Sequence, residues 1–231
     1  RLDAYALVDA AGPDGPYSLH PLTRQLAAEE LAARPEMHDT LKARFARYWV
    51  GFAERYGGGS RNYQTFHYLE DEWPNLKAAA TLLHNRTGVT TLPDEYAGQL
   101  LSNLTHALRG FFTYRGYWEE QVDLSKWVYQ TMITMGNWRS AGWSAYNIAW
   151  VLYNRAKTDQ AAIWTDRCVK AMKRGGYHSD QAVATRMRGL VAWQRGDLDN
   201  AEHLLTKILI DYRDLGNEKG QAIVLVNLGG V

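Results

Sequence analysis

Two sets of residues recur along the second half of the sequence with one shared period of 40. The first set is three arginines: Arg115, Arg155 and Arg195. The second set is three glycines: Gly136, Gly176 and Gly216. Between these markers, apolar residues follow the i, i+3, i+4, i+7 spacing of amphipathic helices. One two-helix unit cannot bury its own apolar face, so the period predicts a stack of such units. The predicted fold class is therefore all-α, a helical-repeat superhelix with a period of 40.

Within this period, the segment GLVAWQRGDLDNAEHLL resembles the tetratricopeptide repeat family. Gly189 takes the small-residue position of the first helix and Gly196 takes the turn. Leu198 takes the bulky position after the turn, and Ala201 the small position of the second helix. The resemblance covers residues 95–231 with a truncated last unit, and it implies that the first helix of each pair lines a concave face.

The units also depart from the family pattern. The first unit has Arg109 and Gln121 where small residues are expected. The period exceeds the family's typical length of about 34 residues, so longer helices are expected. The pattern predicts burial at helix contacts for four residues: Trp118, Ala161, Leu198 and Ala201.

Charge and cysteine content narrow the class of protein. Lys and Arg total 26 against 25 Asp and Glu in 231 residues, and the resulting net charge of +1 argues against direct nucleic-acid binding. No apolar stretch approaches the roughly 20 residues that a membrane span needs. The single cysteine, Cys168, excludes an intramolecular disulfide and fits a reducing, cytoplasmic location. Both ends look cut, so a fragment of a longer protein is expected.

The first 94 positions divide into two parts. Residues 1–35 contain a turn cluster between two short apolar runs, which predicts a hairpin, and then a helix that begins at Pro21. His20 stands at the apparent N-cap of that helix. Residues 36–94 predict a helical linker with capping helices, interrupted after Tyr56 by a run of three glycines that is expected to be a flexible connector.

This order of elements resembles the C-terminal part of bacterial signal-transduction ATPases of the NB-ARC or STAND type. Leu19-His20-Pro21 occupies their apolar-His-Asp motif, and EWPNLKAAATLL resembles the helix that precedes their repeats. The resemblance implies that residues 1–35 are a winged-helix portion and that His20 senses ADP held by an upstream nucleotide-binding domain. Pro21 replaces the motif's acidic residue. The parent protein would bind ADP or ATP, whereas this segment has no P-loop and no cofactor of its own.

The repeats themselves predict a binding site. Ile148, Ala149, Val151 and Leu152 form an apolar core side on the first helix of the second unit. The remaining side chains are predicted to bind a protein or peptide, because aromatic rings and arginines are common interface anchors. They are Tyr146, Trp150, Tyr153 and Asn154 in the second unit, and Arg186, Trp193 and Gln194 in the third. The alternative is that these rings pack against neighbouring helices.

The expected function is a non-catalytic regulatory or sensor segment of a multidomain NTPase switch that binds an activator through its repeats. The alternative is a free-standing repeat scaffold for protein–protein interaction. An enzyme is disfavoured, since the seven histidines include no pair at i, i+4 and the sequence shows no set of catalytic or metal-ligating residues. No metal site is expected.

Overall fold

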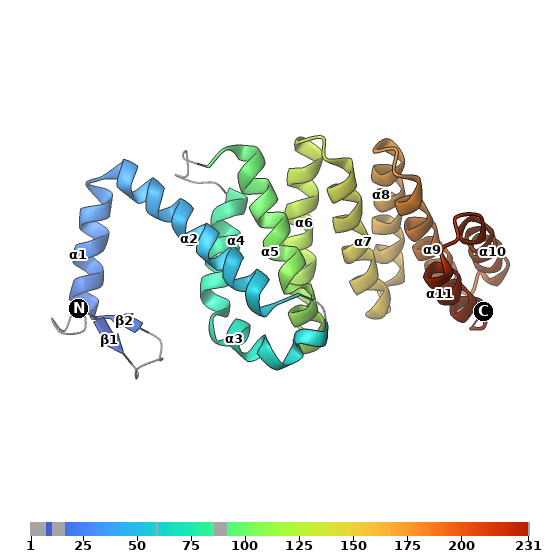
Figure 1. Ribbon diagram of the computed structural model, residues 1–231, viewed down its shortest axis with the longest axis horizontal. Coiled ribbons are helices and arrows are strands. Elements are labelled where there is room, and N and C mark those ends of the chain that lie inside the picture. Colours follow the sequence, from blue (N-terminus) through green and yellow to red (C-terminus); the bar gives the residue numbers. More distant parts are fainter. Residues whose placement is uncertain (1–7, 11–16, 59, 86–91, 231) are drawn as a thin grey trace.

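The computed structural model describes residues 8–10, 17–58, 60–85 and 92–230, which form a row of helices preceded by a hairpin (Figure 1). The prediction of an all-α, helical-repeat-like fold class is confirmed. Strands β1 (Val8–Ala10) and β2 (Tyr17–Leu19) pair antiparallel, with Val8 opposite Leu19. They lie in the segment where the sequence predicts a hairpin. Residues 1–7 and 11–16 lie outside the described residues, and the winged-helix origin of residues 1–35 stays a prediction.

Helical elements occupy most of the described chain. Before the repeats they are α1 (Pro21–Ala32), α2 (Pro35–Tyr56), the 3₁₀ helix η2 (Ser60–Thr65), α3 (Phe66–Asp71) and α4 (Trp73–Asn85). They continue with α5 (Asp94–Arg115), α6 (Trp118–Thr134), α7 (Trp138–Asn154), α8 (Thr158–Arg174), α9 (His178–Gln194), α10 (Leu198–Asp214) and α11 (Glu218–Leu228). The last six begin at evenly spaced positions, 118, 138, 158, 178, 198 and 218, so each period of the repeat holds two helices.

The turns explain this regular spacing. Each turn between α5 and α11 passes through a residue with left-handed backbone, at positions 116, 136, 156, 176, 196 and 216. The residue that follows then donates its N–H to a carbonyl in the last turn of the preceding helix, as Asn137 does to Met132 at 2.9 Å. This is the Schellman motif that ends many helices, and glycine suits its left-handed position. Five of the six turns have glycine there, and the sixth has Ala156 with φ 53°.

Ala156→Gly should therefore stabilise the protein by roughly 0.5–1 kcal/mol. A left-handed backbone costs a non-glycine residue about 1–2 kcal/mol, and the greater freedom of glycine in the unfolded chain offsets about 0.4–1 kcal/mol of that gain. Urea unfolding followed by circular dichroism measures the difference.

Gly136→Ala is the matched control, because Gly136 has φ 71° and no atom within 4 Å of an added Cβ. It should destabilise by a similar amount through backbone strain alone. If both substitutions raised the free energy of unfolding, or both lowered it, the two turns would not share one backbone geometry.

Successive helices from α5 to α11 pack side by side, each against the next (Figure 1). Ala161 and Ala201 are fully buried at these contacts, which confirms two of the four predicted positions. Trp118 is half-buried. The prediction for Leu198 is wrong: 46% of its surface is exposed, because it is the first residue of α10 and projects from the turn.

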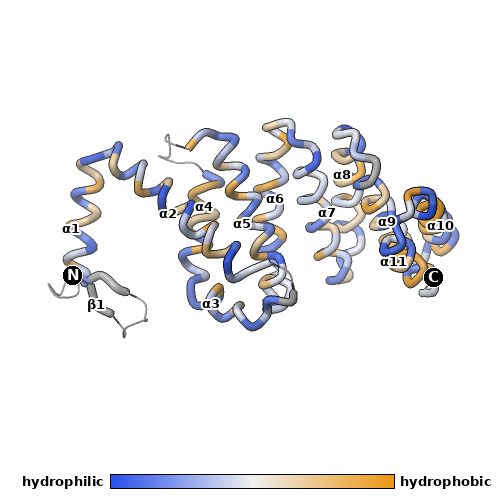
Figure 2. The backbone as a smooth tube through the Cα atoms, in the orientation of Figure 1, coloured by the Kyte–Doolittle hydropathy of each residue, from blue (hydrophilic) through white to orange (hydrophobic). Residues whose placement is uncertain are grey.

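Most of the longer helices are amphipathic along their length. Hydrophobic and hydrophilic segments alternate along each helix in Figure 2, in the way expected when one side packs and the other meets water. Across the described residues, no helix combines the length and the apolar character that a membrane crossing requires.

The linker helices cover the first helix of the repeats. α2 and α4 both pack against α5. Phe66 of α3 and Phe111 of α5 are fully buried there, with ring centroids 5.9 Å apart. Trp73, at the start of α4, packs edge-on against Phe112 with centroids 5.5 Å apart. This aromatic cluster joins residues 60–85 to the repeats in one core.

The first two glycines after α2 are packed, so the prediction of a flexible connector is wrong for them. The N–H of Gly58 donates to the carbonyl of Ala107 on α5 at 2.7 Å. At Gly57, an added Cβ would lie 2.3 Å from that same carbonyl oxygen. Glycine is needed here because α2 ends directly against the backbone of α5.

Candidate functional site

A stripe along one side of α7 carries three of the seven side chains predicted to bind a partner. Trp143, Tyr146, Trp150 and Tyr153 follow one another at i+3 or i+4 spacing, so they share one side of the helix. The opposite side is buried: Ala141, Ala145, Ile148, Ala149 and Leu152. The corresponding sides of α5 and α9, the first helices of the neighbouring units, flank this stripe. We call the surface made by these sides of α5, α7 and α9 the first-helix face.

Hydrogen bonds join α7 to α9 on this face. Arg186 donates from Nη2 to the hydroxyl of Tyr146 at 2.9 Å. Gln194 donates from Nε2 to the backbone carbonyl of Tyr153 at 3.0 Å, and its Oε1 accepts from Thr158. Four predicted partner-binding residues therefore also hold neighbouring repeats together, which matches the alternative of packing between helices for this part of the set.

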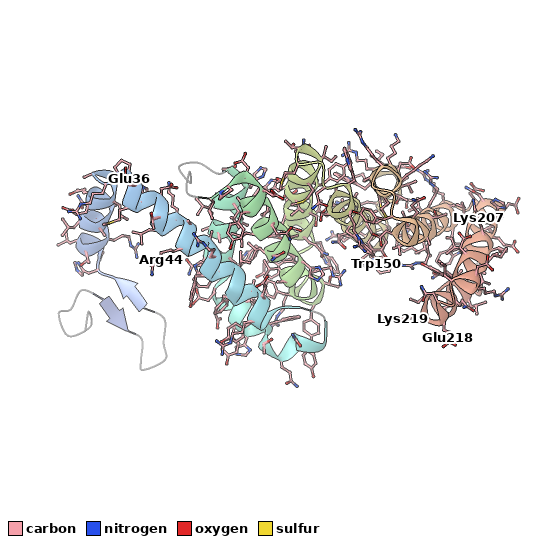
Figure 3. All side chains as sticks on the ribbon, turned by 45° about the horizontal axis from the view of Figure 1, so that its top comes forward. Glu36, Arg44, Trp150, Lys207, Glu218 and Lys219 are labelled. Atoms are coloured by element: carbon pink, nitrogen blue, oxygen red, sulfur yellow. The ribbon has the colours of Figure 1, made fainter. Side chains whose placement is uncertain are left out.

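The two tryptophans among the predicted partner-binding residues, Trp150 and Trp193, remain accessible to solvent. Trp150 and Trp193 have 37% and 38% of their surface exposed. Trp150 stacks on Tyr153 with ring centroids 6.1 Å apart, and the amide of Asn154 donates to the Trp150 carbonyl at 2.7 Å. Figure 3 shows Trp150 near the middle of the row of repeat helices, far from the N-terminal hairpin. The tryptophans therefore offer the largest accessible apolar area among the predicted residues.

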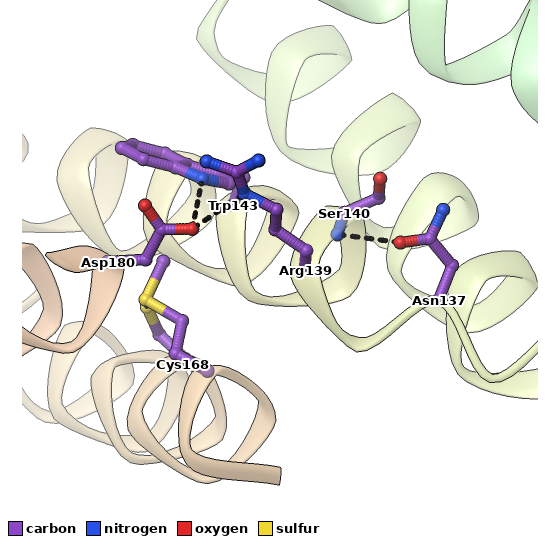
Figure 4. Close-up of polar contacts among 7 residues, drawn as sticks. Asn137, Arg139, Ser140, Trp143, Cys168 and Asp180 are labelled. Atoms are coloured by element: carbon purple, nitrogen blue, oxygen red, sulfur yellow. Dashed lines mark hydrogen bonds and ion pairs between the residues drawn. The ribbon is translucent and has the colours of Figure 1, made fainter. Parts of the chain in front are cut away.

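A buried carboxylate makes a second connection from α9 to α7 (Figure 4). Asp180 accepts through Oδ2 from Arg139 Nε at 2.8 Å and from the Trp143 indole N–H at 3.3 Å. The pKa of Arg139 is raised by this hydrogen bond and by the charge of Asp180. The Arg139 guanidinium also lies 5.1 Å from the Tyr177 ring centroid. The position of Arg139 on the first-helix face is thus set by Asp180 and Tyr177 together.

Between α5 and α7 the first-helix face is hollow. A groove of about 680 Å³ lies here, and its lining includes Val128 of α6, Glu54 of α2 and Gly58, which follows α2. Six lining residues come from α5: Ser102, Asn103, Thr105, His106, Ala107 and Arg109. Five come from α7: Arg139, Ser140, Trp143, Ser144 and Asn147. We call this hollow the α5–α7 groove.

Sequence reasoning missed the α5–α7 groove. One signal was available, because His106, Tyr146 and Arg186 repeat with the period of 40 and therefore occupy one position on three successive first helices. That spacing extends the predicted face from α7 back to α5. The hollow itself could not be read from the sequence, since it depends on how far α6 separates α5 from α7.

His20 lies at the N-cap of α1, as the sequence predicts. Its Nδ1 accepts a hydrogen bond from the Leu22 N–H at 3.3 Å, and the side chain is exposed. Helix α1 has no buried residue, and Leu22 is 70% exposed. Helix α1, which His20 caps, lies at the end of the row of helices away from α7 and α9 (Figure 1), so the structure does not bring the two predicted sites together.

Cys168 is buried inside the stack between α7, α8 and α9. Its Sγ lies 3.7 Å from the sulfur of Met172. Burial, with a smaller contribution from the charge of Asp180, raises the pKa of the Cys168 thiol from 9.0 to about 12. Burial also raises the pKa of Tyr129, Tyr153 and Tyr212. The thiol is therefore held protonated and packed at neutral pH.

Stability should fall as the pH rises from about 9 towards 12. The unfolded chain releases the Cys168 and tyrosine protons at a lower pH than the folded protein does, because burial raises these pKa values only in the folded state. Urea unfolding at a series of pH values measures the slope.

Cys168→Ala serves as the control for the thiol contribution. This variant should lose less stability than the parent between pH 9 and 10. Its stability should still fall at higher pH, where the tyrosines lose their protons. Constant stability of the parent between pH 8 and pH 11 would contradict the raised pKa values.

No group of three or more His, Cys, Asp or Glu side chains that could hold a metal ion occurs among the residues that the structure covers. The candidate site therefore consists of aromatic, amide and arginine side chains on the first-helix face, and it can bind a ligand by stacking, hydrogen bonding and charge.

Comparison with known protein families and with curated proteins finds no match to this sequence. Among solved structures, the fold is similar to the crystal structure of BtubC (BKLC) from P. vanneervenii. The TM-score is 0.53 and the identity 13%, over 85% of this chain and 82% of that chain. At this identity the likeness concerns the fold, and the chain shares a helical-repeat architecture with BtubC.

Proposed function

We propose that this chain is a non-catalytic, tetratricopeptide-like repeat segment that binds a partner protein or peptide on its first-helix face. The observation that carries the proposal is the pair of exposed tryptophans, Trp150 and Trp193, on successive first helices. Rigid aromatic rings bury a large area on binding and lose little side-chain entropy. The adjacent Arg186–Tyr146 pair adds a polar anchor whose position is already fixed.

We further propose that the segment belongs to a multidomain NTPase switch, in which His20 senses ADP. The described residues fit one phosphate contact: Nδ1 of His20 is occupied by the Leu22 N–H, which leaves Nε2 to face a ligand. The positive end of the α1 dipole favours an anion at the same place. The upstream nucleotide-binding domain would supply the remaining contacts to ADP or ATP, and the exposed Leu22 and Leu26 of α1 would pack against it.

Partner binding is tested with an array of short peptides of varied sequence, probed with the labelled protein. Trp150→Ala and Arg186→Ala should each weaken the peptides that bind the parent. Ile163→Ala is the matched control, because Ile163 is 55% exposed on the second helix α8 and should not matter. Equal binding by all three variants and the parent would show that partners dock elsewhere.

The nucleotide role is tested in the full-length protein by ADP retention. His20→Ala should release ADP faster and raise basal activity. Unchanged retention would leave His20 as an N-cap residue only. Absence of a P-loop upstream would favour the free-standing scaffold instead.

A further inference from the structure

Helix α2 carries an apolar stripe on the side opposite its buried residues. Leu41, Phe45, Tyr48 and Phe52 follow one another at spacings of four, three and four residues, so they share one side of the helix. Leu41 and Tyr48 have 40% and 64% of their surface exposed, and Phe45 and Phe52 are half-buried. We call these four side chains the α2 stripe. A continuous exposed patch of this kind is typical of an interaction site.

The described helices leave the α2 stripe open. Helices α4 and α5 pack against the buried side of α2. Helix α1 meets α2 at its start and diverges from it (Figure 1). A hollow of about 660 Å³ lies along the first half of the stripe, and its lining includes Leu41, Phe45 and Tyr48. The stripe can therefore receive a ligand while the described helices keep their places.

The rings of the α2 stripe are held in position by one another. Tyr48 lies edge-on against Trp49 with centroids 5.0 Å apart, and 6.4 Å from Phe52. Phe52 in turn lies 4.7 Å from the Tyr56 ring. Rings supported in this way lose little conformational freedom when a ligand covers them. The stripe is thus a preformed surface.

Positive charge borders the α2 stripe. Residues 40–53 include Lys42, Arg44 and Arg47 and no aspartate or glutamate. Arg44 and Arg47 are exposed, and Figure 3 shows Arg44 part-way along α2, apart from Glu36 at the start of the helix. Glu54, the next carboxylate along the chain, lines the α5–α7 groove instead. The two arginines are therefore available to an acidic ligand.

We propose that the α2 stripe binds an amphipathic helix of a partner protein whose apolar side is bordered by aspartate or glutamate. Apolar side chains that alternate between spacings of four and three form the seam at which two helices mesh, so the spacing indicates a helical ligand. Arg44 and Arg47 pair with its acidic edge. The inference goes beyond the proposed function, because the stripe lies on α2, outside the first-helix face.

Charge and spacing favour this ligand over two others. A second copy of α2 would bring together two stretches that each have three cations and no carboxylate, and like charges across an interface oppose association. An anionic membrane would attract the same cations, but a lipid surface requires no particular spacing of apolar side chains. The alternation of four and three is specific to packing against a helix.

The test uses three fluorescein-labelled peptides of three heptads each. Two carry leucine at the seam and either glutamate or lysine beside it. The third has the composition of the glutamate peptide with its leucines at alternate positions. Fluorescence anisotropy should show the glutamate peptide binding about tenfold more tightly than the lysine peptide, the effect expected of two or three exposed ion pairs. The rearranged peptide should not bind.

Variants of α2 assign the binding to the stripe. Tyr48→Ala should weaken the glutamate peptide tenfold or more, since truncating a central aromatic anchor removes a large contact area. Combining Arg44→Glu with Arg47→Glu should reverse the order of the glutamate and lysine peptides. Val226→Ala is the control, because Val226 is 76% exposed on α11 and should leave binding unchanged. Circular dichroism verifies that each variant keeps the parent's helical content.

Several results would overturn the inference. They are equal binding of the rearranged and glutamate peptides, full affinity in Tyr48→Ala, a dimer of the protein that Tyr48→Ala dissociates, and tighter binding to phosphatidylserine vesicles than to the glutamate peptide. Loss of the glutamate peptide in Trp150→Ala would also overturn it, since the peptide would then occupy the first-helix face. Retained binding in Trp150→Ala supports the α2 stripe whatever the outcome for the proposed function.

Discussion

Phe111→Ala should lower the free energy of unfolding by about 3–5 kcal/mol, the usual range for truncating a fully buried aromatic ring. The Phe111 side chain is completely buried in α5. Its ring lies 5.9 Å from that of Phe66 and 5.1 Å from that of Tyr117, measured between centroids. The substitution would leave a cavity where the linker helices meet the first repeat. Urea unfolding measures the loss.

Tyr114→Ala is the matched control on the same helix. Tyr114 is 57% exposed, so its truncation should cost about 1 kcal/mol or less. A loss of only about 1 kcal/mol for Phe111→Ala, no larger than that for Tyr114→Ala, would mean that the contact between residues 60–85 and the repeats does not depend on the Phe111 ring.

Gly57→Ala should destabilise the protein by roughly 1–3 kcal/mol, the range for forcing extra atoms into a packed site. The added Cβ would overlap the carbonyl oxygen of Ala107 at 2.3 Å and that of Ala53 at 2.5 Å. Both are backbone atoms, so relief requires the backbone at Gly57 to shift away from α5 and from the last turn of α2. The same movement would displace Glu54 and widen the α5–α7 groove.

Gly51→Ala is the control, because Gly51 lies within α2 with no atom within 4 Å of an added Cβ. It should stabilise the protein by about 0.5–1 kcal/mol through helix propensity. Tolerance of alanine at residue 57 as well as at residue 51 would show that α2 does not end against α5 in this way.

Local signals made the repeat helices predictable from the sequence. Glycines at 136, 176 and 216 mark left-handed turns because the backbone there disfavours a Cβ, and the apolar spacing between them marks helices. Ala156 gives no glycine signal, although its backbone is left-handed like that of the glycines at the other turns. Gly57 gave a misleading signal. A glycine run favours flexibility by itself, and only the approach of α5, a helix much later in the chain, makes it a packed contact.

The candidate site was predictable only in part. The stripe on α7 follows from helical spacing, so Trp150 and Tyr153 could be placed on one side of the helix from the sequence. The bond between Arg186 and Tyr146 joins equivalent positions of adjacent units. This bond means that the two side chains also hold neighbouring repeats together. The sequence could not show this, because it does not give the distance between α7 and α9. Arg109 was assessed only as a misfit to a small-residue position, whereas the structure places it in the α5–α7 groove.

The packing of each repeat helix on the next has a consequence for how the chain reaches its native state. Contacts between sequence neighbours give a low contact order, which is associated with fast folding in the microsecond to millisecond range. From α5 to α11 the chain can therefore assemble by successive addition of helices. The closure of α2 on α5 is different, since the bond between Gly58 and Ala107 joins residues that are far apart in the sequence. The chain between residues 58 and 107 must form a closed loop before these contacts can form. We therefore expect α2 to dock on α5 last and this step to set the overall folding rate.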